Sequence, residues 1–260
     1  GTAILKGFGL AAASVGKNER TLEREGLSYG EDYRVVTLHP LAHVGYYPGA
    51  RTMTMKLLYR TKGAVGKILG AQIIGAGGVK ARIDVLAAAI AMGADTDFLT
   101  SLELSYAPPF GAAKDPVNMA GYMAENDLAG LVRFLPADRL KEAREAGVRV
   151  LDVRTASELS HAPAASDAQI PLDELRERFS ELDRSQRWAV LCKVGQRAYT
   201  AARLINQCVP VGYIMKKSMI SFGQQQLLSD IKGTIASTNF RNYPVVENGR
   251  LIGLVSRDNL

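Results

Sequence analysis

Four β-rich stretches followed by two helical patterns constrain the first half of this 260-residue chain. The stretches cover residues 2–16, 33–40, 52–61 and 67–75. A Lys-Gly turn separates the third stretch from the fourth, and such a turn favours antiparallel pairing. Apolar residues at helical spacing then span 79–94, where Gly93 can end a helix, and a second helix is expected at 116–130, opening on Pro116. We therefore expect an α+β domain over residues 1–130, an antiparallel sheet with helices.

The pattern changes at about residue 131, where short helices alternate with short apolar strands. The helices are expected at 136–147, 172–182 and 197–207, and the strands at 148–154 and 188–192. Strands that are apolar on both faces and alternate with helices favour a parallel sheet, so residues 131–207 are predicted to be an α/β domain.

Residues 208–260 show a third pattern, a small β-α-β-β unit. A strand is expected at 211–222, a helix at 227–238, and a hairpin around the Asn248-Gly249 pair, which lies between two apolar runs. The chain therefore divides into three predicted modules.

Charge and cysteine content exclude several functions. The net charge is +6, but the basic residues alternate with acidic ones and form no basic stripe with aromatics, so nucleic acid is not an expected partner. Cys192 and Cys208 give no disulfide framework and no zinc spacing, which favours a reducing compartment and a cytoplasmic location. The most apolar segment, 83–94, is too short to span a bilayer, so no membrane role is expected.

Two further motifs could suggest cofactors. Gly75 to Gly78 lie between a strand and a helix, but the third glycine of a dinucleotide fingerprint would fall on Lys80, so a simple turn is the expectation. His39 and His43 lie in an extended, proline-flanked stretch rather than on a helix, so no metal pair is expected.

Cys192 lies at the end of an apolar strand, and the loop "KVGQR" leads from it into a helix beginning near Arg197. Backbone N–H groups of such a loop and of the helix N-terminus can converge on one point and stabilise an anion. A thiolate there could act as a nucleophile toward sulfur. The alternative from composition alone is a buried, inert cysteine at a strand end.

The segments "VLDVRTASEL", "SHAPAASDAQIPLDELRERF" and "LCKVGQRAYTAARL" resemble the rhodanese family of sulfurtransferases. The resemblance implies that Cys192 carries a persulfide, that Arg197 closes its loop, and that Asp152 and Arg154 form a structural pair. The loop amides that would cradle the sulfur belong to Lys193, Val194, Gly195 and Gln196.

This sequence departs from the rhodanese pattern in two places. Extra residues predict an irregular loop at 160–169. The last strand and helix of the family are replaced by "CVPVGYIM", so the rhodanese-like module at 131–207 is expected to be truncated.

The segments "HVGYYPGA" and "YAPPFGAAKDPVNMAGY" closely resemble the C-terminal dimerisation domain of FAD-dependent pyridine nucleotide–disulfide oxidoreductases, in the CoA-disulfide reductase and NADH oxidase branch. The resemblance implies a homodimer. It also implies FAD and NAD(P)H as cofactors of the parent enzyme, and a small-molecule disulfide, a persulfide or the CoA thiol as substrate.

The same resemblance places Tyr46 and Tyr106 at the flavin and thiol site of the partner subunit. The residues expected to pack near the flavin are Pro108, Pro109 and Phe110. Tyr46, Tyr47 and Tyr106 could equally be aromatic interface residues without a chemical role, and both interpretations stay open.

The last module, with "NYPVVENGRLIGLVSRDNL", resembles a single CBS motif, especially that of CBS-containing inorganic pyrophosphatases. The resemblance implies binding of AMP or ATP, with Ser256 at a phosphate- and ribose-binding position. The family's aspartate is replaced by Asn259. Arg241 and Arg257 could contact phosphate or simply be solvated.

These observations predict the C-terminal part of an FAD- and NAD(P)H-dependent CoA-disulfide or persulfide reductase-like flavoprotein, with a sulfur-carrying cysteine. The chain contains no intact glycine fingerprint for either cofactor, so it is expected to retain at most sulfurtransferase activity by itself. The alternatives are a stand-alone sulfurtransferase and a non-enzymatic dimerising module that senses adenosine nucleotides.

Overall fold

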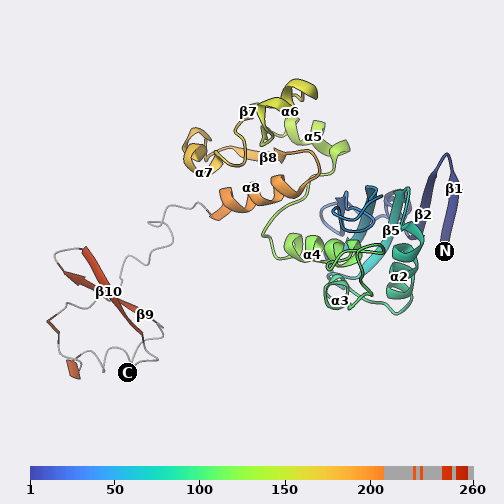
Figure 1. Ribbon diagram of the computed structural model, residues 1–260, viewed down its shortest axis with the longest axis horizontal. Helices are drawn as coiled ribbons and strands as arrows, with labels where there is room; N and C mark the ends of the chain where they lie inside the picture. The colour runs from blue at the N-terminus through green and yellow to red at the C-terminus, as the bar shows by residue number, and fades with distance from the viewer. Residues whose placement is uncertain (208–224, 227–228, 231–241, 248–249, 257–260) are drawn as a thin grey trace. The chain divides into compact units, whose positions relative to one another are not determined.

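The computed structural model describes residues 1–207, 225–226, 229–230, 242–247 and 250–256 (Figure 1). The chain divides into two compact units, Gly1–Gln207 and Cys208–Leu260. Each unit is described by itself.

The first unit begins with a five-stranded antiparallel sheet in the order β1-β2-β5-β4-β3. Its strands are β1 (Thr2–Gly7), β2 (Leu10–Gly16), β3 (Tyr33–Leu38), β4 (Met53–Arg60) and β5 (Ile68–Gly75). Register pairs such as Ser14↔Gln72 and Lys56↔Gln72 align neighbouring strands. The predicted antiparallel sheet is therefore confirmed.

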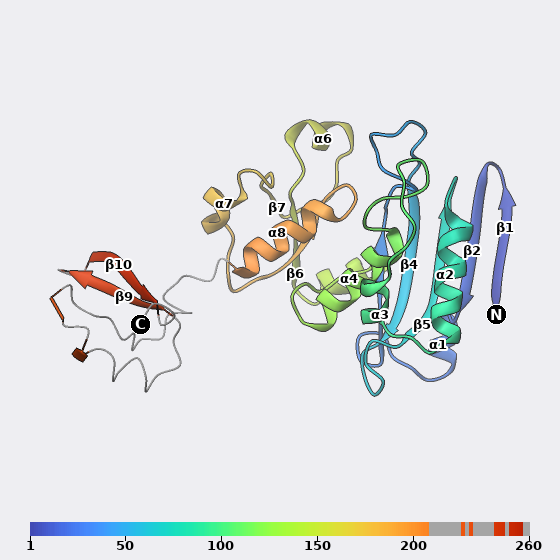
Figure 2. The same ribbon diagram turned by 60° about the horizontal axis from the view of Figure 1, so that its bottom comes forward.

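Helices cover one face of this sheet (Figure 2). They are α2 (Val79–Ala91), α3 (Thr96–Ser101) and α4 (Pro116–Leu128). Helix α1 (Glu19–Arg24) instead packs through Leu22 against Leu58, whose side chain points to the opposite face. Helix α2 packs on β2 and β5, and α4 packs on β3 and β4. Asp115 caps α4 through the amide of Val117, and Pro116 occupies the first turn, where a missing N–H costs nothing. Gly93 follows α2 with a φ of 72°, a left-handed conformation that glycine adopts readily.

Asp127, near the end of α4, ties that helix to the sheet. Its carboxylate is 1% exposed and accepts hydrogen bonds from Tyr59 Oη at 2.8 Å and from Arg34 Nη1 at 3.0 Å. Burial raises the pKa of Tyr59, and the Asp127 charge raises that pKa further. The phenol therefore stays a hydrogen-bond donor to the carboxylate at physiological pH.

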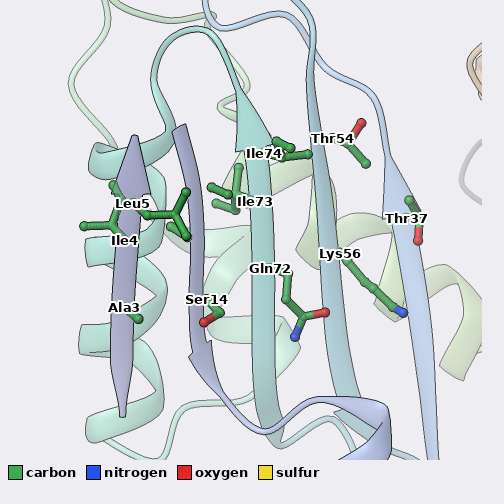
Figure 3. A pocket seen from close by; sticks show the side chains of 12 residues that line it. Ala3, Ile4, Leu5, Ser14, Thr37, Thr54, Lys56, Gln72, Ile73 and Ile74 are labelled. Atoms are coloured by element: carbon green, nitrogen blue, oxygen red, sulfur yellow. The ribbon is translucent and has the colours of Figure 1, made fainter. Parts of the chain in front are cut away.

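The other face of the sheet carries a groove of about 470 Å³ (Figure 3). Ile4, Leu5 and Ile74 give it apolar walls, while Lys56 and Gln72 contribute polar atoms. Leu5 and Ile74 are also among the exposed large apolar residues, so this face presents apolar surface to solvent.

Residues 137–207 form an α/β module built on a parallel sheet of order β7-β6-β8, which confirms the predicted parallel sheet. Its strands are β6 (Val148–Asp152), β7 (Ala168–Gln169) and β8 (Arg187–Leu191), and its α-helices are α5 (Leu140–Glu145), α6 (Ala156–His161), α7 (Leu175–Arg178) and α8 (Gln196–Gln207). Leu151, Leu175 and Ala201 lie in its core.

Two predicted helices of this α/β module are shorter than expected. The segment 136–147 splits into a 3₁₀ turn, Ala137–Arg139, and α5, while 172–182 gives α7 followed by a 3₁₀ turn, Phe179–Glu181. Short helices are marginal in isolation, so tertiary packing, here of Leu175 and Phe179 on the core, decides how far they extend.

In the second unit, β9 (Asn242–Glu247) and β10 (Arg250–Ser256) pair antiparallel, with Glu247 opposite Arg250. This pairing confirms the two strands of the predicted hairpin. The strand expected at 211–222 lies outside the described residues, and of the helix expected at 227–238 only 229–230 are described, as helix.

Among the described residues, no helix is both long and apolar enough to cross a membrane.

Candidate functional site

Two loops at one end of the first sheet bring Tyr46 and Tyr106 together. Tyr46 belongs to the loop between β3 and β4, and Tyr106 to the loop between α3 and α4. Their phenol oxygens are 3.1 Å apart, a hydrogen bond in which either hydroxyl can donate. The Val44 amide also donates to the Gly111 carbonyl at 3.0 Å, so the backbones of the two loops are joined as well.

The phenol pair is open to solvent. Tyr46 is 76% exposed and Tyr106 45% exposed. The hydrogen bond from Tyr46 is the largest cause that raises the pKa of Tyr106 above its ordinary value. The Tyr106 hydroxyl therefore remains protonated at neutral pH. The phenol whose proton is not used within the pair can donate to a thiolate or to an oxygen anion.

Phe110 lies in the same loop as Tyr106 and is 76% exposed. Pro109 is exposed and Pro108 half-buried beside it. These side chains present an apolar surface against which a planar ring could pack. Tyr47 instead stacks edge-on against His43. His39 and His43 have separate partners, the Thr54 hydroxyl and the Val44 carbonyl.

A buried ion pair, which sequence reasoning missed, lies under the two loops. Arg82 of α2 is 5% exposed and binds Asp115 through Nε and Nη2, at 3.1 and 2.8 Å from Oδ2. Its guanidinium also reaches the backbone carbonyls of Ala42 and Phe110.

The glycine turn before α2 does not fit a dinucleotide-binding site. It follows β5, a strand of an antiparallel sheet rather than of a parallel βαβ unit. Gly78 has a φ of 72°, and a Cβ at this residue would collide with the Arg82 guanidinium, which occupies the space in front of the turn. The expectation of a simple turn thus agrees with the geometry.

A second group of residues surrounds Cys192, which is half-buried directly after β8. Its Sγ accepts hydrogen bonds from the amides of Gly195, at 3.1 Å, and Ala198, at 3.3 Å. Gly195 has a φ of 101°, which turns the loop back toward the sulfur before α8 begins at Gln196.

The amides that bond to Cys192 Sγ are only partly those that the sequence predicts. Of the four predicted amides, that of Gly195 bonds to the sulfur, and Ala198 adds a donor from the first turn of α8. Lys193, Val194 and Gln196 are exposed around it. Converging N–H groups of this kind favour a negative charge on the sulfur.

Arg197 is held by Glu158 of α6. Its Nη1 and Nη2 donate to the two carboxylate oxygens at 2.7 and 2.6 Å. Glu158 also completes the capping box of α6 with Thr155. The hydrogen bonds to Glu158 are the largest cause that raises the pKa of Arg197 above its ordinary value.

The Glu158 carboxyl should titrate far below an ordinary glutamate. The Arg197 hydrogen bonds, followed by the Thr155 amide, lower its pKa from 4.5 to about 2. Because the folded-state pKa is depressed, the stabilisation is present above pH 4.5 and is lost as pH falls through about 2. In a ¹³C-carboxyl NMR titration, we expect Arg197→Gln to move the Glu158 midpoint up toward 4.5.

The matched control is Glu181, whose pKa is lowered by Arg178. Its titration should not change in Arg197→Gln. An unchanged Glu158 midpoint in the variant would contradict the assigned cause.

Asp152 and Arg154 form the buried pair expected at the end of β6. Asp152 is fully buried, and its carboxylate accepts from Arg154 Nη2 at 2.6 Å and from the Arg154 amide at 3.0 Å. Arg154 Nη1 also donates to the Ala162 carbonyl, which anchors the segment after α6. The pair thus joins the end of β6 to the segment after α6.

The predicted nucleotide-binding residues are only partly described. Ser256 is the last residue of β10, while Asn259, Arg241 and Arg257 lie outside the described residues.

Comparison with known families identifies two segments. Residues 3–116 match the family "pyridine nucleotide-disulphide oxidoreductase, dimerisation domain". Residues 211–260 match the CBS domain family.

Similar curated proteins include coenzyme A disulfide reductases of Staphylococcus haemolyticus, 39% identical over 126 residues, and of a Staphylococcus aureus strain, 38% identical over 125 residues. Each match covers 48% of this chain and 27% of the relative. The chain thus spans about a quarter of the length of these reductases.

Two solved structures resemble more of the chain. Reduced Bacillus anthracis CoADR-RHD has a TM-score of 0.74 with 39% identity, and the NAD-dependent persulfide reductase from A. fulgidus has a TM-score of 0.69 with 37% identity. Both likenesses cover 79% of this chain and 36% of the other, so they extend past residues 3–116. In sequence and in fold, the segment that carries Tyr46 and Tyr106 matches the dimerisation domain of pyridine nucleotide-disulphide oxidoreductases.

Proposed function

We propose that this chain is the dimer-forming, C-terminal part of an FAD- and NAD(P)H-dependent reductase of CoA disulfide or of a persulfide. The observation that carries the proposal is the exposed Tyr46–Tyr106 hydrogen bond on the segment that matches the dimerisation domain. The similarity to CoA disulfide reductases and to a persulfide reductase supports this substrate class.

In this proposal the homodimer places Tyr46 and Tyr106 at the partner's reaction site. Flavin and nicotinamide supply the electrons for cleaving the disulfide or persulfide when they are bound. The phenols hydrogen-bond the sulfur that leaves as a thiolate and lower the cost of its charge. Phe110, with Pro108 and Pro109, packs beside the flavin and excludes water from this site.

The Cys192 loop has a second role in the proposal, as a rhodanese-like sulfur carrier. The Cys192 thiolate attacks the outer sulfur of a donor such as thiosulfate, the S–S bond of the donor breaks, and sulfite leaves with the electron pair. The persulfide formed on Cys192 is then the sulfur source for the reductase. The amides of Gly195 and Ala198 stabilise the Sγ thiolate before the attack.

The CBS-matching segment is proposed to bind an adenosine nucleotide, AMP or ATP, with Ser256 and Asn259 at the binding positions. A stand-alone sulfurtransferase is the second candidate function, because the geometry of the Cys192 loop does not depend on the reductase. The proposed location of the protein is the cytoplasm.

A chimera tests the reductase role. Residues 1–130 would replace the matching region of the Staphylococcus haemolyticus CoA disulfide reductase, which brings its own cofactor domains. We expect the chimera to reduce CoA disulfide with a nicotinamide cofactor, and Tyr46→Phe or Tyr106→Phe to lower kcat about a hundredfold, because a donor to the developing thiolate is lost.

Tyr47→Phe is the matched control, since Tyr47 adjoins Tyr46 but contacts His43 instead. It should leave kcat unchanged. A dimeric, flavin-loaded chimera that works equally well without both phenol hydroxyls would refute the proposed role of the pair.

A further inference from the structure

We propose that Arg82 is the positioning residue of the Tyr46–Tyr106 pair, because its buried guanidinium joins the two loops that carry the phenols. The chemical role of the phenols in this inference rests on the proposed function, whereas the placement of the phenols by Arg82 is argued from the hydrogen bonds alone.

The phenol pair needs an external support. Its hydrogen bond lies in solvent, where each hydroxyl can exchange its partner for water at small net cost. Such a bond cannot by itself hold two long loops in one arrangement, because ordering them costs conformational entropy. The Val44–Gly111 backbone hydrogen bond joins the loops at one point, and the buried contacts beneath the loops supply further support.

Arg82 supplies contacts to both loops from one nitrogen. Its Nη2 donates to the Ala42 carbonyl at 3.0 Å and to the Phe110 carbonyl at 3.3 Å. Ala42 precedes Tyr46 in the first loop, and Phe110 follows Tyr106 in the second. The carbonyls on either side of the phenol pair therefore share one donor group.

Asp115 fixes the orientation of the guanidinium. It binds Nε and Nη2 of Arg82, and its Oδ1 also accepts from the Val117 amide at the start of α4. Arg82 is thus anchored to two helices, its own α2 and α4. A planar guanidinium can satisfy these acceptors together, whereas a lysine ammonium lacks the rigid fork.

Gly78 makes room for this arrangement. Arg82 Nη1 donates to the Gly78 carbonyl at 3.3 Å, and a Cβ at residue 78 would collide with the same nitrogen. The glycine turn that resembles a dinucleotide fingerprint is thereby explained as space for an arginine.

The test follows Tyr106 in the full chain by an NMR titration of ¹³C-labelled tyrosine. The Tyr46 hydrogen bond is the largest cause that raises the pKa of Tyr106 above its ordinary 10.0, and Tyr46→Phe defines the part of the rise that this bond supplies. We expect Arg82→Lys and Gly78→Ala to lose most of the same upward shift. A folded Arg82→Lys protein that keeps the full shift would overturn the proposal.

Two variants serve as matched controls. Gly93→Ala alters a glycine of the same φ, 72°, at the other end of α2, where a Cβ meets no atom within 4 Å. Arg34→Lys perturbs a different ion pair, with Asp127. Both should keep the Tyr106 shift, and a loss as large as in Gly78→Ala would show that general loosening, rather than Arg82, moves the phenols.

If the Arg82→Lys protein does not fold, a measurement on the wild-type chain tests the proposal instead. Scalar couplings across the hydrogen bonds should link the Arg82 guanidinium nitrogen to the carbonyl carbons of Ala42 and Phe110, and their absence would overturn the proposal. An inactive chimera combined with an intact Tyr106 shift would instead remove the proposed function and leave the positioning role in place.

Discussion

A Cys192→Ser protein should transfer sulfur from thiosulfate to cyanide at least about a thousandfold more slowly than the wild type, because the hydroxyl that replaces the thiol is a far weaker nucleophile. In the wild type, cyanide attacks the outer sulfur of the Cys192 persulfide, forms thiocyanate and returns the thiolate. Thiocyanate release over time measures the rate, and mass spectrometry should detect one added sulfur atom on Cys192 after treatment with thiosulfate.

Cys208→Ser makes the same chemical change at the second cysteine and should retain the wild-type rate. Thiocyanate release that is equal in the wild type and in Cys192→Ser would eliminate the sulfurtransferase role of the loop. It would leave the reductase proposal to the chimera experiment.

Asp127→Ala should destabilise the first sheet domain by about 3 kcal/mol, because the buried Tyr59 hydroxyl and the half-buried Arg34 lose their shared acceptor. Native-state hydrogen exchange measures this change locally. The amides of Leu57 and Leu58 lie in β4, whose side chains are fully buried there, and should exchange faster by the factor that this free energy sets.

The matched control is Asp84→Ala. Asp84 pairs with Lys80 on the exposed face of α2, and exposed pairs contribute about 0–1 kcal/mol. Equal exchange rates in the Asp127→Ala and Asp84→Ala proteins would contradict the role assigned to the buried network.

Much of the secondary structure could be predicted because local patterns determine it. β5 was expected at 67–75 and spans Ile68–Gly75, and α4 begins at the predicted Pro116. Alternation of apolar residues, turn glycines and helix caps act over a few neighbouring residues, so they can be recognised without the fold.

The candidate sites were only partly predictable, because their supports come from distant parts of the chain. Tyr46 and Tyr106 were both singled out, but nothing in their spacing shows that their hydroxyls meet. Arg82 reads as an ordinary charged residue of a helix until the fold brings Ala42 and Phe110 over it.

Glu158, in the α/β module of residues 137–207, also has one partner that the local sequence does not reveal. The Thr155-x-x-Glu158 spacing signals a capping box and so the start of α6. Its partnership with Arg197 joins two elements that are separated by β7, α7 and β8, and no local pattern encodes it.

One carboxylate thus contacts two helices, because Glu158 caps the N-terminus of α6 and accepts hydrogen bonds from Arg197 in the first turn of α8. Fraying of α6 and release of Arg197 are consequently linked equilibria: whatever unwinds the first also frees the second. A ligand that binds near α6 could therefore change the electrostatic surroundings of Cys192 without touching the sulfur.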